Sequence, residues 1–204
     1  FAWSNSGGSN AQATFSPTST TTYAVTVTDA NTCTATASRS VTVNSLPTAA
    51  ISPATVAICN GQSAILTASG GTQFAWSNSG GSNAQATFSP TSTTTYTVTV
   101  TDANTCTATA SRSVSVNSLP TAVISPATVA ICNGQSATLI ASGGTQFAWS
   151  NSGGNNPQAT FSPTSTSTYT VTVTNSTNCS ATVSRVVTVQ LTDQLLFVPV
   201  YKLP

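Results

Sequence analysis

"TTYTVTVTD" at residues 94–102 alternates threonine with tyrosine or valine, which is the pattern of a strand with one buried face. Its inward positions are Tyr96, Val98 and Val100, and the threonines between them face outward. "CTATASRSVSV" (106–116) follows after a short turn and predicts a strand that pairs back as a hairpin. These strands indicate a β fold, because no stretch of the chain carries the 3.6-residue apolar period of a helix.

Further short strands precede this hairpin, each bounded by proline or by a Gly-Gly turn. They are predicted at 48–52, 63–69, 72–78 and 84–89. Six or seven short strands in a 73-residue unit are typical of a small sandwich. The sequence therefore predicts an all-β chain of immunoglobulin-like antiparallel β-sandwich domains.

The unit repeats along the chain, since "FAWSNSGG" begins at residues 1, 74 and 147. A short junction containing proline, "VNSLPT", separates the units, so we expect the tandem sandwiches to be arranged end to end. The predicted domains are a partial repeat at 1–45 that lacks the first two strands, complete repeats at 46–118 and 119–191, and a non-repeating apolar tail at 192–204.

Composition excludes several classes of function. The charged fraction is 3% with a net charge of +1, which leaves no basic patch for nucleic acid. No apolar run approaches the roughly 20 residues that a membrane helix needs. The chain has no histidine, and each repeat offers at most one aspartate, so neither general acid–base catalysis nor a calcium site is expected. We expect no enzyme activity, no catalytic or metal-binding residues and no cofactor.

The five cysteines follow the period of 73 residues, with Cys33, Cys106 and Cys179 in one series and Cys59 and Cys132 in the other. The economical prediction is one disulfide in each complete repeat, Cys59–Cys106 and Cys132–Cys179. Disulfides indicate an extracellular or cell-surface protein. Cys33 is then left unpaired or available for an intermolecular bond.

The partial repeat raises a question that the sequence leaves open. A half sandwich in water exposes its apolar face and an open strand edge, so residues 1–45 should not be stable alone. Either the native protein continues upstream, or another chain completes this half unit.

The tail supplies a candidate for such a completing strand. "LLFVPVYKL" (195–203) is the most apolar stretch of the chain, and an extended strand of this kind can insert into an incomplete sandwich of another subunit. Head-to-tail insertion does not close on itself and would form a filament. The alternative is that the tail begins a further domain. The candidate assembly strand comprises Leu195, Leu196, Phe197, Val198, Val200 and Tyr201.

Aromatic residues recur at fixed positions of each repeat and admit two interpretations. We expect them to be core residues of the sandwich, although an aromatic platform for glycans is the alternative. The threonine ladder of 97–101 is likewise interpreted as a solvent-facing strand surface, with an ice-binding array as the rival. The predicted core aromatics are Phe74, Trp76, Tyr96, Phe147, Trp149 and Tyr169.

Four strings of the last repeat also carry a family resemblance: "ISPATVAICNGQSATLIASGG", "FAWSN", "FSPTSTSTYTVTVT" and "NCSATVSRVVTV". They resemble the Ig-like or PKD-like tandem repeats of large secreted surface proteins of Bacteroidetes-type bacteria, which include gliding and attachment adhesins. The resemblance covers residues 1–191 and implies an extracellular spacer or adhesive role.

Taken together, these observations predict a non-enzymatic extracellular structural protein, a rod or filament of disulfide-stapled repeats. Its expected partners are further copies of itself or the rest of a longer repeat protein. The alternative is a cell-surface adhesin whose repeats bind a glycan or another surface.

Overall fold

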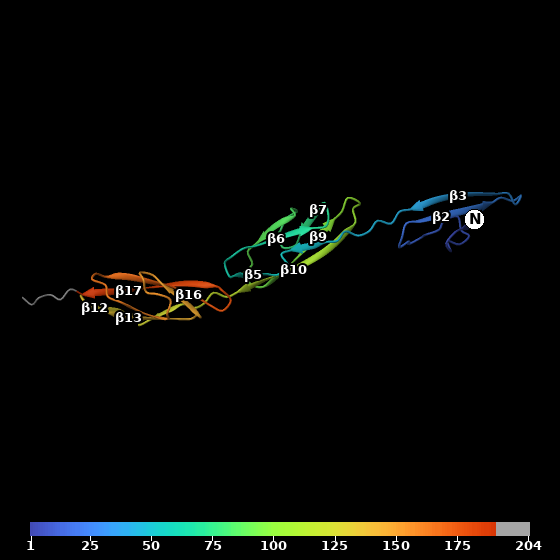
Figure 1. Cartoon of the computed structure of the whole chain (residues 1–204). Coiled ribbons are helices and arrows are strands. Elements are labelled where there is room, and N and C mark those ends of the chain that lie inside the picture. The colour runs from blue at the N-terminus through green and yellow to red at the C-terminus, as the bar shows by residue number, and fades with distance from the viewer. Residues whose placement is uncertain (191–204) are drawn as a thin grey trace, which may run out of the picture. The chain divides into compact units, whose positions relative to one another are not determined.

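A computed structural model describes residues 1–190, and every regular element within them is a β-strand (Figure 1). The strands of any one sheet come from a single repeat. We call residues 1–45 the open repeat, 46–118 the second repeat and 119–191 the third repeat.

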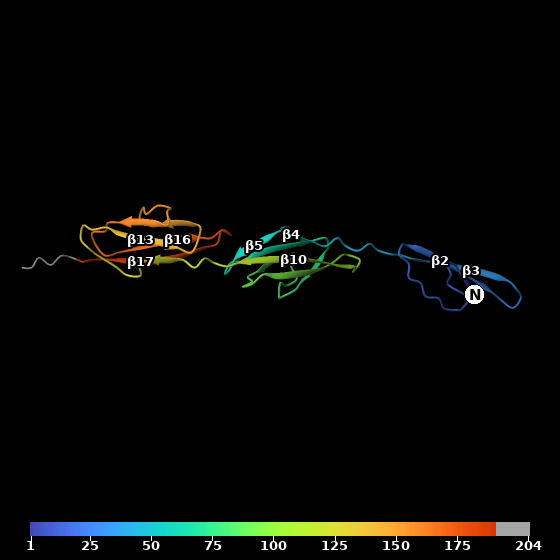
Figure 2. The same cartoon turned by 90° about the horizontal axis from the view of Figure 1, so that it is seen from below.

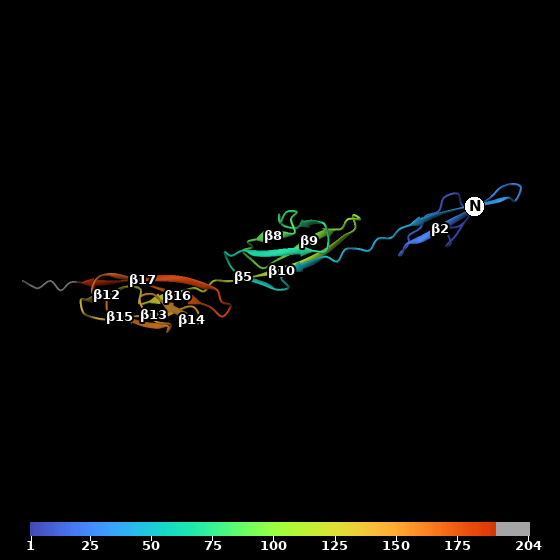
Figure 3. The ribbon, with the colours of Figure 1, turned by 45° about the horizontal axis from the view of Figure 1, so that its top comes forward.

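The third repeat is a sandwich of two sheets, whose strands β12 to β17 can be followed in Figure 3. One sheet has the order β11-β13-β15, formed by Val123–Ser125, Ala137–Ser142 and Gln158–Phe161. The other has the order β12-β17-β16-β14, formed by Val129–Cys132, Ser180–Gln190, Ser167–Thr174 and Gln146–Trp149. The predicted tandem Ig-like β-sandwich is therefore the fold of the chain.

The core of this repeat lies between the two sheets. Burial alternates along β16, where Tyr169, Val171 and Val173 are buried between less buried neighbours, because successive side chains of a strand point to opposite faces. From the facing sheet, Leu139 is completely buried. The ring of Phe161 stacks on that of Tyr169 with centroids 3.8 Å apart, and Trp149 meets Phe161 edge-on.

Strand β12 is the element that the sequence analysis did not predict. The chain leaves β11 at Ser125, passes a cis peptide bond before Pro126, and enters the other sheet at Val129. There β12 runs parallel to β17, with Cys132 opposite Gln190. The sandwich is thus antiparallel except for this one pairing at the edge of the larger sheet.

The second repeat has the same strand orders, β4-β6-β8 and β5-β10-β9-β7 (Figure 2 labels β4, β5 and β10). The predicted strand at 94–102 is β9, and the predicted hairpin partner at 106–116 is β10. The bounds are Ala50–Ser52 (β4), Val56–Cys59 (β5), Ala64–Ser69 (β6), Gln73–Trp76 (β7), Gln85–Phe88 (β8), Thr94–Thr101 (β9) and Thr107–Asn117 (β10).

The open repeat forms a single sheet of the order β1-β2-β3, with bounds Ala2–Trp3, Thr21–Thr28 and Thr34–Val41. Residues 12–15, which correspond to strand β8 of the second repeat, form no strand here. In the complete repeats this strand pairs with a neighbour (β6 or β13) that has no counterpart among residues 1–45. The aromatic cluster of the complete repeats is nevertheless retained, since Phe15 stacks on Tyr23 at 3.8 Å.

A pair of adjacent substitutions tests the core of the third repeat. We expect Leu139→Ala to destabilise this repeat by about 2–5 kcal/mol, because it removes a completely buried side chain and leaves a cavity. Ile140→Ala is the matched control, since Ile140 is 48% exposed and its truncation should change the free energy of unfolding by less than ~0.5 kcal/mol. Hydrogen exchange of third-repeat peptides in rising denaturant measures both. Equal effects of the two substitutions would contradict the register of β13.

Candidate functional site: a disulfide clasp

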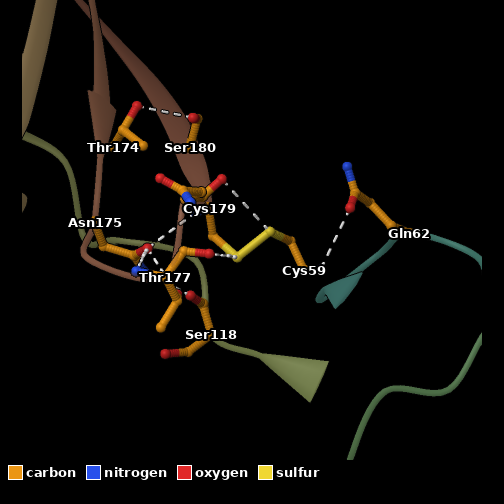
Figure 4. The surroundings of a disulfide bond; sticks show 9 residues. Cys59, Gln62, Ser118, Thr174, Asn175, Thr177, Cys179 and Ser180 are labelled. Atoms are coloured by element: carbon orange, nitrogen blue, oxygen red, sulfur yellow. Dashed lines mark hydrogen bonds between the residues drawn. A yellow bond between two sulfur atoms is a disulfide. The ribbon is translucent and has the colours of Figure 1, made fainter. Parts of the chain in front are cut away.

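One disulfide links consecutive repeats, and Figure 4 shows its surroundings. It joins Cys59, the last residue of β5, to Cys179, the residue before β17, with their Cα atoms 5.5 Å apart. Residues 57–63, which carry Cys59, form one compact unit with residues 89–94 and the described residues from Ser115 on. Cys59 is therefore part of the same compact unit as Cys179, although its strand β5 pairs within a sheet of the second repeat.

The predicted pairings Cys59–Cys106 and Cys132–Cys179 are wrong, and the unpredicted strand gives the reason. Because β12 runs parallel to β17, Cys132 lies beside Gln190 at the end of that long strand, whereas Cys179 precedes its beginning. Eleven residues of strand separate the two levels, which is about 35 Å at roughly 3.3 Å per residue. A disulfide needs its Cα atoms within about 7 Å. A bond within the repeat would therefore require the sandwich to break.

The second repeat obeys the same constraint. The amide of Asn60 donates to the carbonyl of Asn117 at 2.9 Å, which fixes Cys59 near the end of β10, while Cys106 precedes β10. Cys33, Cys106 and Cys132 are free, with Cys33 and Cys132 exposed and Cys106 half-buried. The signal that the sequence offered was the apolar "VAIC" segment of each complete repeat, which is compatible with a strand but too short to be distinguished from a loop.

A side-chain turn holds Cys179 in place. Asn175 Oδ1 accepts hydrogen bonds from the amides of Thr177 (3.1 Å) and Cys179 (3.0 Å). Asp102 and Asp29 build the same turn in the other repeats, where one carboxylate oxygen accepts from the amides of Cys106 and Cys33. Such turns suit Asn and Asp, whose short side chains reach the backbone two residues on.

Asn175 makes one contact that an aspartate cannot make. Its Nδ2 donates to the carbonyl of Ser118 at 2.9 Å, and Ser118 belongs to the junction between the second and third repeats. A carboxylate is an acceptor only and would face this carbonyl without a donor. Asn175 thus uses its oxygen for the turn and its nitrogen for the junction (Figure 4). We call this hydrogen bond and the Cys59–Cys179 disulfide together the clasp.

A hollow of about 340 Å³ lies beside the clasp. Gln62 fixes one wall, since its Oε1 accepts from the amide of Cys59 at 3.3 Å. The lining carries no charged side chain and gives no chemistry beyond hydrogen bonding. The lining residues are Cys59, Asn60, Gly61, Gln62, Leu119, Asn178 and Ser180.

Two arginines fix the first strand of their own repeats. Arg185 donates to the carbonyls of Ile124, at 3.0 Å, and Ala127. Arg112 does the same with Ile51, at 3.1 Å, and Ala54. These four carbonyls flank the cis prolines that lie between strands β4 and β5 in the second repeat and between β11 and β12 in the third. Arg39 occupies the equivalent position in the open repeat and makes no such bond within residues 1–190.

The aromatic residues lie in the sandwich interiors. Trp76, Tyr96, Trp149 and Tyr169 are buried, whereas Phe74 and Phe147 are half-buried. The indole nitrogens of Trp76 and Trp149 donate to the carbonyls of Asn83 and Asn156. No aromatic platform for a glycan is formed by these residues. Nor is the threonine ladder a free array, because the hydroxyl of Thr97 bonds that of Ser111 across the hairpin.

The predicted assembly strand, 195–201, lies outside the described residues. Within residues 1–190 there is no cluster of three or more metal-binding side chains. The same part of the chain holds no helix with the length and apolarity that spanning a bilayer requires.

Comparison with known proteins identifies no family. No family model and no curated protein matches the chain. Among solved structures it is similar to a Ca²⁺-stabilised adhesin with which an Antarctic bacterium binds ice, at 12% identity and a TM-score of 0.41. That match covers 85% of this chain and 57% of the adhesin, so the chain spans less than two thirds of its length.

Two further solved structures show similarity at the same level. An I-band fragment of titin is 13% identical with a TM-score of 0.40, covering 84% of this chain and 75% of the fragment. The insect immune protein hemolin is 14% identical with a TM-score of 0.38, covering 83% and 56% respectively. These values assign neither a family nor a function to the chain.

Peptide mapping tests the connectivity of the clasp. We expect peptic digestion of the non-reduced chain, after blocking of free thiols, to release one disulfide-linked pair that contains Cys59 and Cys179. Recovery of a Cys59–Cys106 pair would contradict the position of Cys59 near the end of β10, which the Asn60–Asn117 hydrogen bond defines.

The amide of Asn175 gives a second test. We expect Asn175→Asp to keep the turn, as Asp102 does, and to lose the bond to Ser118. Because such a bond contributes about 0.5–1.5 kcal/mol, the equilibrium constant for closing the Cys59–Cys179 disulfide with glutathione should fall roughly 2- to 10-fold. Thr177→Val is the control. It removes the hydroxyl that donates to Asn175 Oδ1 and leaves the hydrogen bond between Asn175 and Ser118 intact. If the equilibrium constant for disulfide closure is the same in Asn175→Asp and in the unmodified chain, Asn175 does not contribute to the clasp.

Proposed function

We propose that this chain is a non-enzymatic structural protein of the cell exterior that assembles head to tail into a fibre of Ig-like repeats. The clasp supports this role, because disulfides persist in oxidising compartments outside the cytoplasm. It also joins successive repeats, which is where a load-bearing protein needs reinforcement. The 3% charged composition does little to oppose lateral association of such fibres.

The observation that carries the proposal is the uncovered core of the open repeat. Val27 and Val41 are 39% and 40% exposed, whereas their counterparts Val100 and Val114 in the second repeat are completely buried. Burying apolar surface contributes roughly 25 cal/mol per Å², so this face favours a covering strand. In the complete repeats the equivalent valines are covered by a three-stranded sheet whose first strand is β4 or β11.

The occupant that we assign to this face is the tail, residues 192–204 of another copy. Pro199 follows Pro126 by one period of 73 residues and Pro53 by two, so the tail keeps the register of the first strand. In that register Phe197 takes the position of Ile124, which is 2% exposed in the third repeat. Leu196 takes the position of Val123, which is 48% exposed.

Hydrogen bonding by Arg39 also supports placing the tail in the register of the first strand. In both complete repeats the equivalent arginine binds carbonyls on either side of the proline. The tail carbonyls at those two positions belong to Phe197 and Val200. A tail in this register gives Arg39 the partners that it lacks, and strand insertion into an incomplete sandwich is an established mode of assembly.

Two neighbouring substitutions in the tail test the proposal. We expect the 204-residue chain to form polymers by light scattering and electron microscopy. Phe197→Asp should reduce them to monomers, because it places a charge at a buried position of the inserted strand.

Leu196→Asp is the matched control, with the same change of charge at an outward position, and should leave polymers in place. Polymers that persist with Phe197→Asp, or a monomeric unmodified chain, would refute assembly through the tail.

A further inference from the structure

The position of the disulfide in the repeat pattern explains why the other three cysteines are free. The disulfide joins the first cysteine of one repeat, Cys59, to the second cysteine of the next repeat, Cys179. By the period of 73 residues, Cys132 is equivalent to Cys59, while Cys33 and Cys106 are equivalent to Cys179. The same pattern places the partners of these three cysteines one repeat before or after, where residues 1–204 supply none. The three are also the free cysteines of the structure.

The turns that flank the bonded cysteines are also present beside the free cysteines Cys132 and Cys33. At the first half, Gln135 N donates to Cys132 O at 3.0 Å, as Gln62 N donates to Cys59 O at 3.0 Å. At the second half, Cys33 N donates to Asp29 Oδ1 at 2.9 Å, as Cys179 N donates to Asn175 Oδ1 at 3.0 Å. The backbone turns beside Cys132 and Cys33 are therefore those found beside the bonded Cys59 and Cys179, although Asp29 lacks the amide nitrogen with which Asn175 bonds Ser118.

We propose that Cys132 of one copy forms a disulfide with Cys33 of a second copy and thereby seals the head-to-tail contact covalently. This inference rests on the proposed fibre, in which the open repeat of the second copy follows the third repeat of the first. Both thiols are exposed. Cys106 is the poorer partner, because it is half-buried and its repeat already follows residues 1–45 along its own chain.

The chemistry is ordinary thiol–disulfide exchange with oxidised glutathione as the oxidant. The Cys132 thiolate attacks oxidised glutathione, forms a mixed disulfide and releases one glutathione thiolate. The Cys33 thiolate of the second copy then attacks the Cys132 sulfur of that mixed disulfide and releases the second glutathione. Two cysteine thiols are oxidised to one disulfide, and one oxidised glutathione is reduced to two thiols.

Oxidation of the full chain in glutathione buffer, followed by denaturing electrophoresis without reductant, tests the proposal. We expect a ladder of multiples of 20.5 kDa that reductant collapses to the monomer. Cys33→Ser and Cys132→Ser should each give monomers alone, because each variant keeps one half of the bond. An equimolar mixture of the two variants should give dimers and no higher species. Cys106→Ser is the control and should leave the ladder unchanged.

Peptide mapping of the dimer should recover Cys132 linked to Cys33. A ladder that survives in Cys33→Ser, or a linkage of Cys132 to Cys106 or to a second Cys132, would overturn the proposal. So would polymers in native light scattering that denaturant alone returns to monomers, although the fibre itself would then stand. A chain that is monomeric under native conditions and gives no ladder would refute the fibre as well.

Discussion

The parallel pairing of one short strand with the last strand of its repeat determines how this chain is cross-linked. Strand β12 carries Cys132 to one end of β17, while Cys179 stays at the other end. The length of that strand therefore forbids a bond within the repeat. Cysteines held at opposite ends of a sandwich can pair only with a neighbour. A single edge pairing thus converts what would be a staple of one domain into a connection between two.

Much of the fold could be predicted from the sequence, because alternation such as "TTYTVTVT" maps directly onto buried and exposed strand faces. The short strand Val129–Cys132 could not, since four residues after a proline carry too little periodicity to distinguish a strand from a loop. Missing it made the cysteine pairing wrong, because spacing along the chain says nothing about which end of a sandwich a cysteine occupies. The clasp was accordingly not predicted, although both of its cysteines were recognised as candidates for disulfides.

Near-identity of the repeats makes their few differences informative. Asp102 and Asn175 occupy equivalent positions and build the same turn, so the turn explains neither choice. The junction distinguishes them, because only the amide nitrogen of Asn175 can donate to Ser118. Arg39 and Arg185 are identical residues in different surroundings, and the difference between them comes from the strand that each has or lacks. Equivalent positions in a repeat protein are thus not equivalent in what they contact.

The separation of 120 residues between the bonded cysteines also has a mechanical meaning. Tension applied to the two ends of the chain passes from Cys59 directly to Cys179 through the sulfur atoms. The residues between them form a closed covalent loop that stretching cannot extend. At about 3.3–3.6 Å per residue, the loop withholds on the order of 400 Å of contour length from the applied force. Strands β4, β5 and β17 lie outside that loop and carry the tension, whereas the rest of both complete sandwiches lies inside it and is not stretched while the sulfur–sulfur bond holds.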